Sequence, residues 1–323
     1  MTLNCQQLHE QLQNLSKLKV QFDAALEAGD VKAAEGASEL LERCVSELFE
    51  QTAPSSCKVT FSDPETHLES EIDIDIESAL YSFANLYVGK LDLEIDYEKV
   101  RDIWRRNYRE IKREMAKYGY SRLLIVPDDL PDEATLNQKL VETGFRHQAG
   151  RLEPVHKTHQ YAEFKVGGSF QGLRSPEEAK YRLILTHRTD NVHHNQWANP
   201  FLKATLGKGL DFISSLNLEE INRRVEQGEK IPVNFEVQIN GSTYPVRAEG
   251  LSLKTYLLLQ GVCERESWTH LDTQGSTWLP GSFSGPRIVF AFWNEDSARF
   301  EINAGHPSLS DDVLACRFGK SFE

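Results

Sequence analysis

A histidine-rich stretch in the second half of the chain has residue types that could bind a metal ion. It contains His187, Asp190, His193 and His194, and imidazoles and carboxylates are common ligands of transition metals. The spacing matches no established metal-binding motif, and the adjacent His193 and His194 would point to opposite faces of a strand. A polar loop with partly buried, hydrogen-bonded histidines is the simpler interpretation. A metal-dependent enzyme is therefore an alternative prediction, and the main prediction includes no metal and no cofactor.

Three other short motifs also have an ordinary structural explanation. Residues 206–209 and 166–169 contain paired glycines, but neither segment has the full pattern of a phosphate-binding loop. Asp311 and Asp312 are adjacent carboxylates, which could act in acid–base chemistry or bind calcium. A surface turn is the preferred interpretation of this pair. No Ser/His/Asp or Cys/His arrangement can be assembled from the sequence alone, so we expect no catalytic residues.

Composition limits the classes of function. The chain has 323 residues, a mass of 36.8 kDa and a net charge of −13, with 40% hydrophobic residues. An acidic balance argues against a protein whose main task is to coat nucleic acid. No apolar run approaches the roughly 18 residues of a membrane span, and the first residues lack a classical secretory signal. The five scattered cysteines suggest reduced thiols, so we expect a cytoplasmic protein.

Residues 1–52 are predicted to form a helical hairpin. Apolar residues recur every three or four positions on both sides of a short turn at Gly29 and Asp30. Glycine suits a left-handed helix end, and aspartate can cap the helix that follows. We expect these two helices to mediate oligomerisation or attachment.

Residues 53–150 are predicted to be a helical region with a small βα unit. Acidic and apolar residues alternate in residues 71–76, which favours either a strand with one solvent-exposed face or an acidic linker to the next helices. The clearest helix spans 97–118, and a buried strand at 121–127 precedes another helix. The basic residues of the 97–118 helix are Lys99, Arg101, Arg105, Arg106, Arg109, Lys112, Arg113 and Lys117. They could bind nucleic acid, or they could form a solvated face that nearby acidic residues neutralise.

Residues 151–323 change in character, with short strands, glycines and aromatic residues. The strongest signal is a hairpin, in which an alternating strand at 233–239 is followed by Asn240-Gly241 and a return strand. A helix is expected between Asn217 and Gly228. Further strands are expected at 162–166, 181–186, 287–293, 298–303 and 313–318, and a further helix at 252–261.

The C-terminal strands resemble the end of C-type-lectin-fold proteins. The shared pattern is a strand containing Trp293, a polar turn at 294–297, a second strand, an irregular loop at 304–312, and a closing strand with Arg317. The nearest families in style are the variable proteins of diversity-generating retroelements and the formylglycine-generating-enzyme-like domains. The resemblance covers about the last seventy residues. Ala315 stands where the family usually has glycine, and the cysteine pair of the formylglycine-generating enzymes is absent, so their chemistry does not carry over.

The resemblance implies a rigid scaffold that displays variable side chains to a ligand. Ala298, Phe300 and Ile302 would point inward, and the intervening side chains would face a partner. The alternative is an ordinary solvent-exposed hairpin with Trp293 in the core. The residues predicted to bind ligand are Phe292, Trp293, Asn294, Asp296, Ser297, Arg299, Glu301, Asn303, His306, Ser308 and Ser310.

The combined prediction is an α+β protein with three parts. Residues 1–52 form a helical hairpin, 53–150 a helical and βα region, and 151–323 a C-type-lectin-like domain with antiparallel strands. The predicted function is binding of a protein or small ligand, as in the diversified target protein of a retroelement, without enzymatic activity. A metal-dependent enzyme and a nucleic-acid-binding module are the alternatives.

Overall fold

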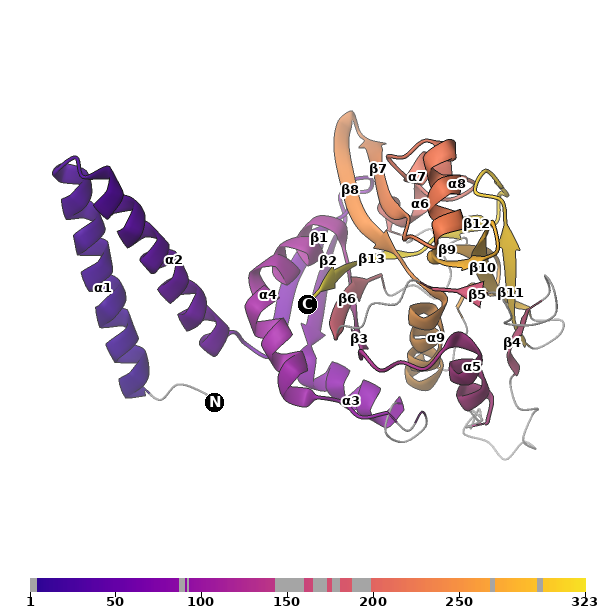
Figure 1. Ribbon diagram of the computed structural model, residues 1–323, viewed down its shortest axis with the longest axis horizontal. Coiled ribbons are helices and arrows are strands. Elements are labelled where there is room, and N and C mark those ends of the chain that lie inside the picture. Colours follow the sequence, from indigo (N-terminus) through magenta and orange to yellow (C-terminus); the bar gives the residue numbers. More distant parts are fainter. Residues whose placement is uncertain are drawn as a thin grey trace.

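The computed structural model describes residues 5–86, 91, 93–142, 160–164, 173–175, 181–187, 199–267, 271–294 and 299–323. These residues form helices and mainly antiparallel sheets, which confirms the predicted α+β class. Figure 1 shows a helical hairpin that projects from a body built around sheets. No helix within the described ranges is long and apolar enough to cross a bilayer.

The projecting part is the predicted hairpin of two long helices, α1 (Cys5–Glu27) and α2 (Val31–Thr52). Gly29 has a φ of 71°, in the left-handed region that ends a helix. Asp30 caps α2, because its carboxylate accepts a hydrogen bond from the Ala33 amide at 3.1 Å. Both turn residues therefore have the roles that the sequence predicts.

Residues 71–75 of the acidic alternation belong to a strand, as the first of the two alternatives predicts. β1 (Ser56–Ser62) pairs with β2 (Glu69–Asp75) in an antiparallel ribbon, and α3 (Ile76–Leu86) follows. Ile72 and Ile74 are buried, whereas Glu71 and Asp73 lie on the wet face. Lys58 on β1 lies 3.7 Å and 3.2 Å from these two carboxylates. The strand thus separates apolar and charged residues onto its two faces.

Helix α4 (Tyr97–Tyr118) has the predicted bounds. The Asp96 carboxylate accepts a hydrogen bond from the Lys99 amide at 3.0 Å, and Gly119 ends the helix with a φ of 70°. Its buried side includes every apolar residue expected there, namely Val100, Ile103, Trp104, Ile111, Met115 and Tyr118. The helix packs against β1 and against the larger sheet behind it.

A five-stranded sheet joins the middle of the chain to its C-terminal end. Its order is β3-β6-β13-β8-β7. The predicted boundary at residue 150 therefore does not separate two sheets, because β3 from the βα unit pairs along its whole length with β6. The strand bounds are β3 (Arg122–Val126), β6 (Arg182–Thr186), β7 (Pro232–Ile239), β8 (Ser242–Gly250) and β13 (Phe318–Phe322).

The predicted hairpin in this sheet is confirmed. β7 and β8 pair in register from Pro232 opposite Glu249 to Ile239 opposite Ser242. Asn240 and Gly241 have φ angles of 50° and 78°, and positive φ at both central residues is what a type I′ turn requires.

A second sheet carries the C-terminal segment that resembles lectin-type domains. Its main order is β12-β9-β10-β11-β4, and β5 also pairs with β9. The predicted strands 287–293 and 298–303 are present with slightly shifted ends. The strand bounds are β4 (Gln160–Phe164), β5 (Leu173–Arg174), β9 (Ser276–Ser284), β10 (Arg287–Asn294), β11 (Arg299–Gly305) and β12 (Leu314–Cys316).

The single closing strand predicted at 313–318 is wrong. Residues 314–316 pair with β9 in one sheet, and residues 318–322 pair with β6 and β8 in the other. Arg317 is the crossing point, and its amide donates a hydrogen bond to the Thr277 hydroxyl at 3.1 Å. The chain therefore links the two sheets at this residue, which local alternation could not reveal.

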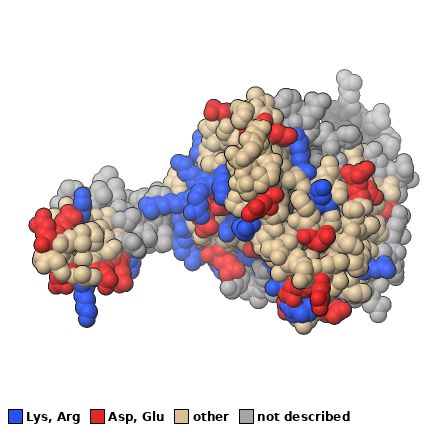
Figure 2. Space-filling view, turned by 90° about the horizontal axis from the view of Figure 1, so that it is seen from above, with Lys and Arg blue, Asp and Glu red and all other residues tan. Residues whose placement is uncertain are grey.

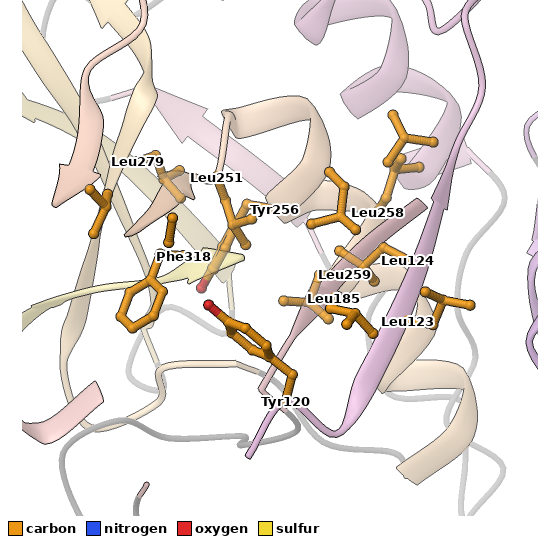
Figure 3. Packing of buried hydrophobic residues seen from close by; sticks show 14 of the residues in the cluster. Tyr120, Leu123, Leu124, Leu185, Leu251, Tyr256, Leu258, Leu259, Leu279 and Phe318 are labelled. Carbon is orange, nitrogen blue, oxygen red and sulfur yellow. The ribbon is translucent and has the colours of Figure 1, made fainter. Parts of the chain in front are cut away.

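Helices fill the space between and beside the sheets. α5 (Glu133–Glu142), α6 (Pro200–Lys203), α7 (Leu210–Ile213), α8 (Leu218–Gln227) and α9 (Leu253–Ser267) complete the body. Figure 3 shows Leu258 and Leu259 of α9 packed with Leu124 of β3 and Leu185 of β6. α9 thus supplies the apolar filling that joins the βα unit to the C-terminal half.

An ion pair lies inside this core. Arg317 donates from Nε and Nη2 to the two carboxylate oxygens of Asp272, at 2.9 Å and 2.8 Å. The Tyr256 hydroxyl donates to the same carboxylate at 2.7 Å. The side chains of Arg317 and Asp272 are 2% and 0% exposed. A bidentate guanidinium–carboxylate contact of this kind offsets the free-energy cost of removing both charges from water.

Candidate binding surface

Two loops that are distant in the sequence lie side by side at the edge of the second sheet. The Leu210 amide donates to the Pro307 carbonyl at 2.8 Å, and the Gly207 amide donates to the Leu314 carbonyl at 2.9 Å. Gly209 lies so close that an added Cβ would be 3.0 Å from the Pro307 oxygen. The segments around residues 207–213 and 305–314 therefore form one continuous surface.

This surface exposes large apolar side chains between polar ones. Phe212, Leu309 and Val313 are 45%, 40% and 46% exposed. The Lys208 ammonium group lies 5.2 Å from the centroid of the Phe212 ring, at cation–π distance. We call the exposed residues of both segments the loop surface: Lys208, Asp211, Phe212, His306, Ser308, Leu309, Ser310, Asp311, Asp312 and Val313.

Local hydrogen bonds fix the shape of the second loop. The His306 Nδ1 atom lies 2.7 Å from the Ser308 hydroxyl, and the Leu309 amide donates to the His306 carbonyl at 2.9 Å. Asp311 accepts from the Val313 amide at 3.1 Å. A loop that is already ordered loses less conformational freedom when it binds a partner.

The loop is also anchored to the sheet beneath it. An added Cβ on Gly305 would lie 2.9 Å from Leu309, 3.2 Å from Trp278 and 3.4 Å from Phe290. The two rings beneath pack edge to face, with centroids 5.5 Å apart. Leu309 therefore lies against Gly305, close to the two rings, and is still 40% exposed.

Two residues predicted to contact ligand are instead buried, which corrects the prediction for them. Trp293 is 6% exposed and Glu301 is 0% exposed, and Asn294 donates to the Glu301 carboxylate at 2.8 Å. β11 lies between β10 and β4, and an interior strand can be covered on both faces. Alternation therefore assigned Phe300 and Ile302 correctly to the core, but it wrongly assigned Glu301 to the surface.

The other predicted residues divide into three groups. His306, Ser308 and Ser310 are exposed on the loop surface. Phe292, Asn294 and Asn303 are half-buried on the neighbouring strands. Asp296, Ser297 and the Arg299 side chain lie outside what the structure describes.

Sequence reasoning missed the first of the two loops. The sequence of residues 206–209 indicates only an incomplete phosphate-binding loop, and no local pattern singles out Phe212. One signal was present: Leu309 and Val313 are large apolar residues in an otherwise polar, irregular segment. No local pattern indicates that residues 207–213 lie beside them.

The metal-site alternative gains no support from His187. Its side chain is 3% exposed, and its Nε2 atom lies 3.1 Å from the Tyr118 carbonyl oxygen, to which it must donate. Its ring packs 4.7 Å from Tyr120 and 5.5 Å from Phe318. Burial lowers the pKa of His187 to about 4. Asp190, His193 and His194 lie outside the described residues, and no cluster of three metal-ligating side chains occurs within them.

The basic face of α4 is partly neutralised by neighbouring carboxylates. Arg101 binds Glu77 and Glu98, each at 2.8 Å, and Arg105 binds Asp102 at 2.8 Å. Figure 2 shows Lys and Arg side chains gathered where the hairpin meets the body, with acidic side chains among them. Mixed signs of charge are the pattern of a solvated helix face.

A small polar pocket lies where β6, β8 and β13 meet the start of α9. Its lining includes Arg182, Lys230, Glu249 and Ser321. Lys230 lies 3.4 Å from Glu249, and the Ser321 hydroxyl donates to that carboxylate at 3.0 Å. The enclosed space is about 20 Å³, enough for roughly one water molecule. The polar side chains of this pocket therefore mainly form ion pairs and hydrogen bonds with one another.

Comparison with family models, curated proteins and solved structures finds no match.

Proposed function

We propose that the protein binds another protein through the loop surface. The observation that carries the proposal is the grouping of Phe212, Leu309 and Val313, each at least 40% exposed, on two ordered loops. Partner-binding surfaces commonly place apolar anchors inside a polar rim. Here hydroxyl, imidazole and carboxylate groups of the second loop supply the rim.

We also propose that the body is a C-type-lectin-like scaffold, of the kind that retroelement variable proteins use. The support is the C-terminal sequence pattern together with the exposure of His306, Ser308 and Ser310. Diversification needs side chains that can change without loss of the fold. These three positions meet that need, whereas the buried Trp293 and Glu301 do not. The N-terminal hairpin would then hold copies together or attach them elsewhere.

The retroelement part is tested in the gene's surroundings. We expect a near-repeat of the codons for residues 287–318 beside a reverse transcriptase gene. Differences between the two copies should fall at adenines and concentrate in the codons for His306, Ser308 and Ser310. Absence of a repeat and of the reverse transcriptase would refute this part, while leaving the binding surface to be judged separately.

The binding surface is tested with a randomised library at Ser308, Leu309, Ser310 and Val313. Displayed on yeast and selected against hen lysozyme as a probe, the library should yield specific binders that stay folded. Substitutions at exposed positions usually change stability by no more than about 0.5 kcal/mol. A matched library at the buried residues Ala291, Trp293, Phe300 and Glu301 should lose folded protein. If the loop library unfolds to the same degree, or yields no binder, the loop surface is not a display site.

A further inference from the structure

The N-terminal hairpin exposes large apolar side chains that the rest of the described chain does not cover. Val20, Leu26, Val31 and Leu40 are 65%, 56%, 66% and 40% exposed, although they lie on long helices. The hairpin extends away from the body and reaches α4 only through α2 (Figure 1). Helices in proteins gain most of their stability from packing of an apolar face, which a pair of helices satisfies only in part.

One face of α2 is shaped for close approach of another helix. Ala33, Gly36 and Leu40 follow one another at intervals of three and four residues, so they share a side of the helix. All three are exposed, and a Cβ added to Gly36 would meet nothing within 4 Å. Ala34 and Ala37, by contrast, are buried. The exposed face is therefore separate from the face that these two alanines occupy.

Charge on the two helices points to the occupant of this face. Lys17 on α1 and Glu39 on α2 lie twelve and ten residues from Gly29, on opposite sides of the turn. Since a helix rises about 1.5 Å per residue, their heights along the hairpin differ by only about 3 Å. Both side chains are exposed, and neither has an interaction within the described part of the chain.

We propose that two copies of this chain associate through their hairpins to form a four-helix bundle. With the two-fold axis along the hairpin, α1 of one copy lies beside α2 of the other, and residues of equal height meet. Lys17 then faces Glu39 of the second copy, and symmetry repeats the pair. The face of Ala33, Gly36 and Leu40 is covered by the neighbouring α1, as in bundles built from helical hairpins.

This arrangement places both bodies at the same end of the bundle. The inference gives a specific form to the oligomerisation role proposed for the hairpin, and it does not depend on what the loop surface binds. If both hold, two loop surfaces act together, and bivalent attachment strengthens binding to a repeated target without new contacts.

The first test is the mass of the full chain in solution, measured by sedimentation equilibrium. We expect about twice the 36.8 kDa of one chain. Leu40→Glu should produce the single-chain mass, because it buries a charge at the centre of the helix contact. The matched control is Leu68→Glu, which changes a leucine that is 55% exposed on the body and should leave the dimer intact. Circular dichroism checks that both variants keep their helices.

The second test asks whether the charge pair joins two copies. Lys17→Glu and Glu39→Lys should each raise the dimer dissociation constant severalfold, because each creates two pairs of like charge. An equimolar mixture of the two variants should restore the dimer, since a mixed pair again brings opposite charges together. Only pairing between copies can give this rescue. A monomeric wild-type chain, a dimeric Leu40→Glu variant or a mixture without recovery would each overturn the proposal.

Discussion

At the scale of single residues, the ion pair between Arg317 and Asp272 joins the two sheets from inside the core. Arg317 lies where the chain passes from β12 to β13, and Asp272 precedes β9. The carboxylate receives three hydrogen bonds, two of them from the guanidinium. Asp272 also has a φ of 54°, an uncommon value for a residue other than glycine. The pair therefore fixes both the crossing point and the turn that approaches it.

Removal of one partner should be costly. Among the described residues, Arg317→Met leaves the buried Asp272 carboxylate with the Tyr256 hydroxyl as its remaining hydrogen-bond donor. We therefore expect a loss of about 3–5 kcal/mol in the free energy of unfolding. Urea denaturation measures the change. The double variant Arg317→Met with Asp272→Asn should lose much less than the sum of the two single changes. Simple additivity would mean that the two side chains do not act as a pair.

His187 should make stability depend on pH. Burial lowers its folded-state pKa to about 4, from the usual 6.5. Between these values the unfolded chain binds a proton that the folded chain does not, so stability falls as the pH decreases from 6.5 towards 4. The shift corresponds to about 3 kcal/mol, fully available above pH 6.5. His187→Phe should flatten this part of the curve in urea melts at pH 4 to 8. An unchanged slope in the variant would assign the effect to other groups.

Residue-level prediction from sequence succeeded where one local rule decides the outcome. The Gly29 and Asn240-Gly241 conformations follow from steric preference alone, and Asp30 caps α2 as expected. It failed for Glu301, because the cover on β11 comes from other parts of the body. The partnership of Arg317 with Asp272 was also beyond prediction, since 45 positions separate them.

At the scale of elements, the two helices α4 and α8 end in the same way but in different surroundings. Gly119 and Gly228 have φ angles of 70° and 71°. An added Cβ on Gly119 would lie 2.6 Å from the Asn199 amide nitrogen and 3.0 Å from Phe61. The same atom on Gly228 would lie no closer than 3.6 Å to Arg174. The end of α4 at Gly119 is therefore packed against the body, whereas the end of α8 at Gly228 has space for a Cβ atom.

Alanine substitution should separate backbone strain from packing at these two positions. Gly228→Ala should cost about 1–2 kcal/mol, the cost of a left-handed conformation for a residue with a Cβ. Gly119→Ala should cost clearly more, because Asn199 and Phe61 must also move. Thermal unfolding of both variants measures the difference. Equal losses would mean that the surroundings of Gly119 adjust freely.

Elements with strong end signals were predictable, and elements defined by their partners were not. α4 and the β7–β8 hairpin have both capping or turn residues and clear periodicity. α4 appears with the expected limits, and the hairpin has the expected turn. The sequence predicts one continuous closing strand because residues 313–318 are mainly apolar. Its division between two sheets depends on β6, β8 and β9, none of which is close in sequence.

At the scale of the whole molecule, the five-stranded sheet makes residues 122–323 one structural unit. β3 pairs with β6 from Arg122 opposite Thr186 to Val126 opposite Arg182. The described part of the hairpin, in contrast, meets the body near the end of α2 (Figure 1). Division of the chain should therefore have unequal consequences at the two predicted boundaries.

Two fragments test this. Residues 53–323 retain every strand, so this fragment should unfold cooperatively, with a midpoint close to that of the full chain. Residues 151–323 lack β3 and α4. Without these two elements the apolar faces of β6 and α9 are exposed, so this fragment should be aggregated or unfolded. Calorimetry and size-exclusion chromatography compare the two. A stable, monomeric 151–323 fragment would show that the boundary at 150 separates independent domains after all.

The position of β13 also has a consequence for how the protein reaches its native state. This strand lies between β6 and β8, and the bond from the Thr186 hydroxyl to the Phe318 carbonyl spans 132 positions. During synthesis, the edges of β6 and β8 that face β13 stay unpaired until residues 318–322 have emerged from the ribosome. Contacts of such long range slow folding, and open strand edges can pair with other chains. Newly made protein should therefore be most prone to aggregation before residues 318–322 have emerged.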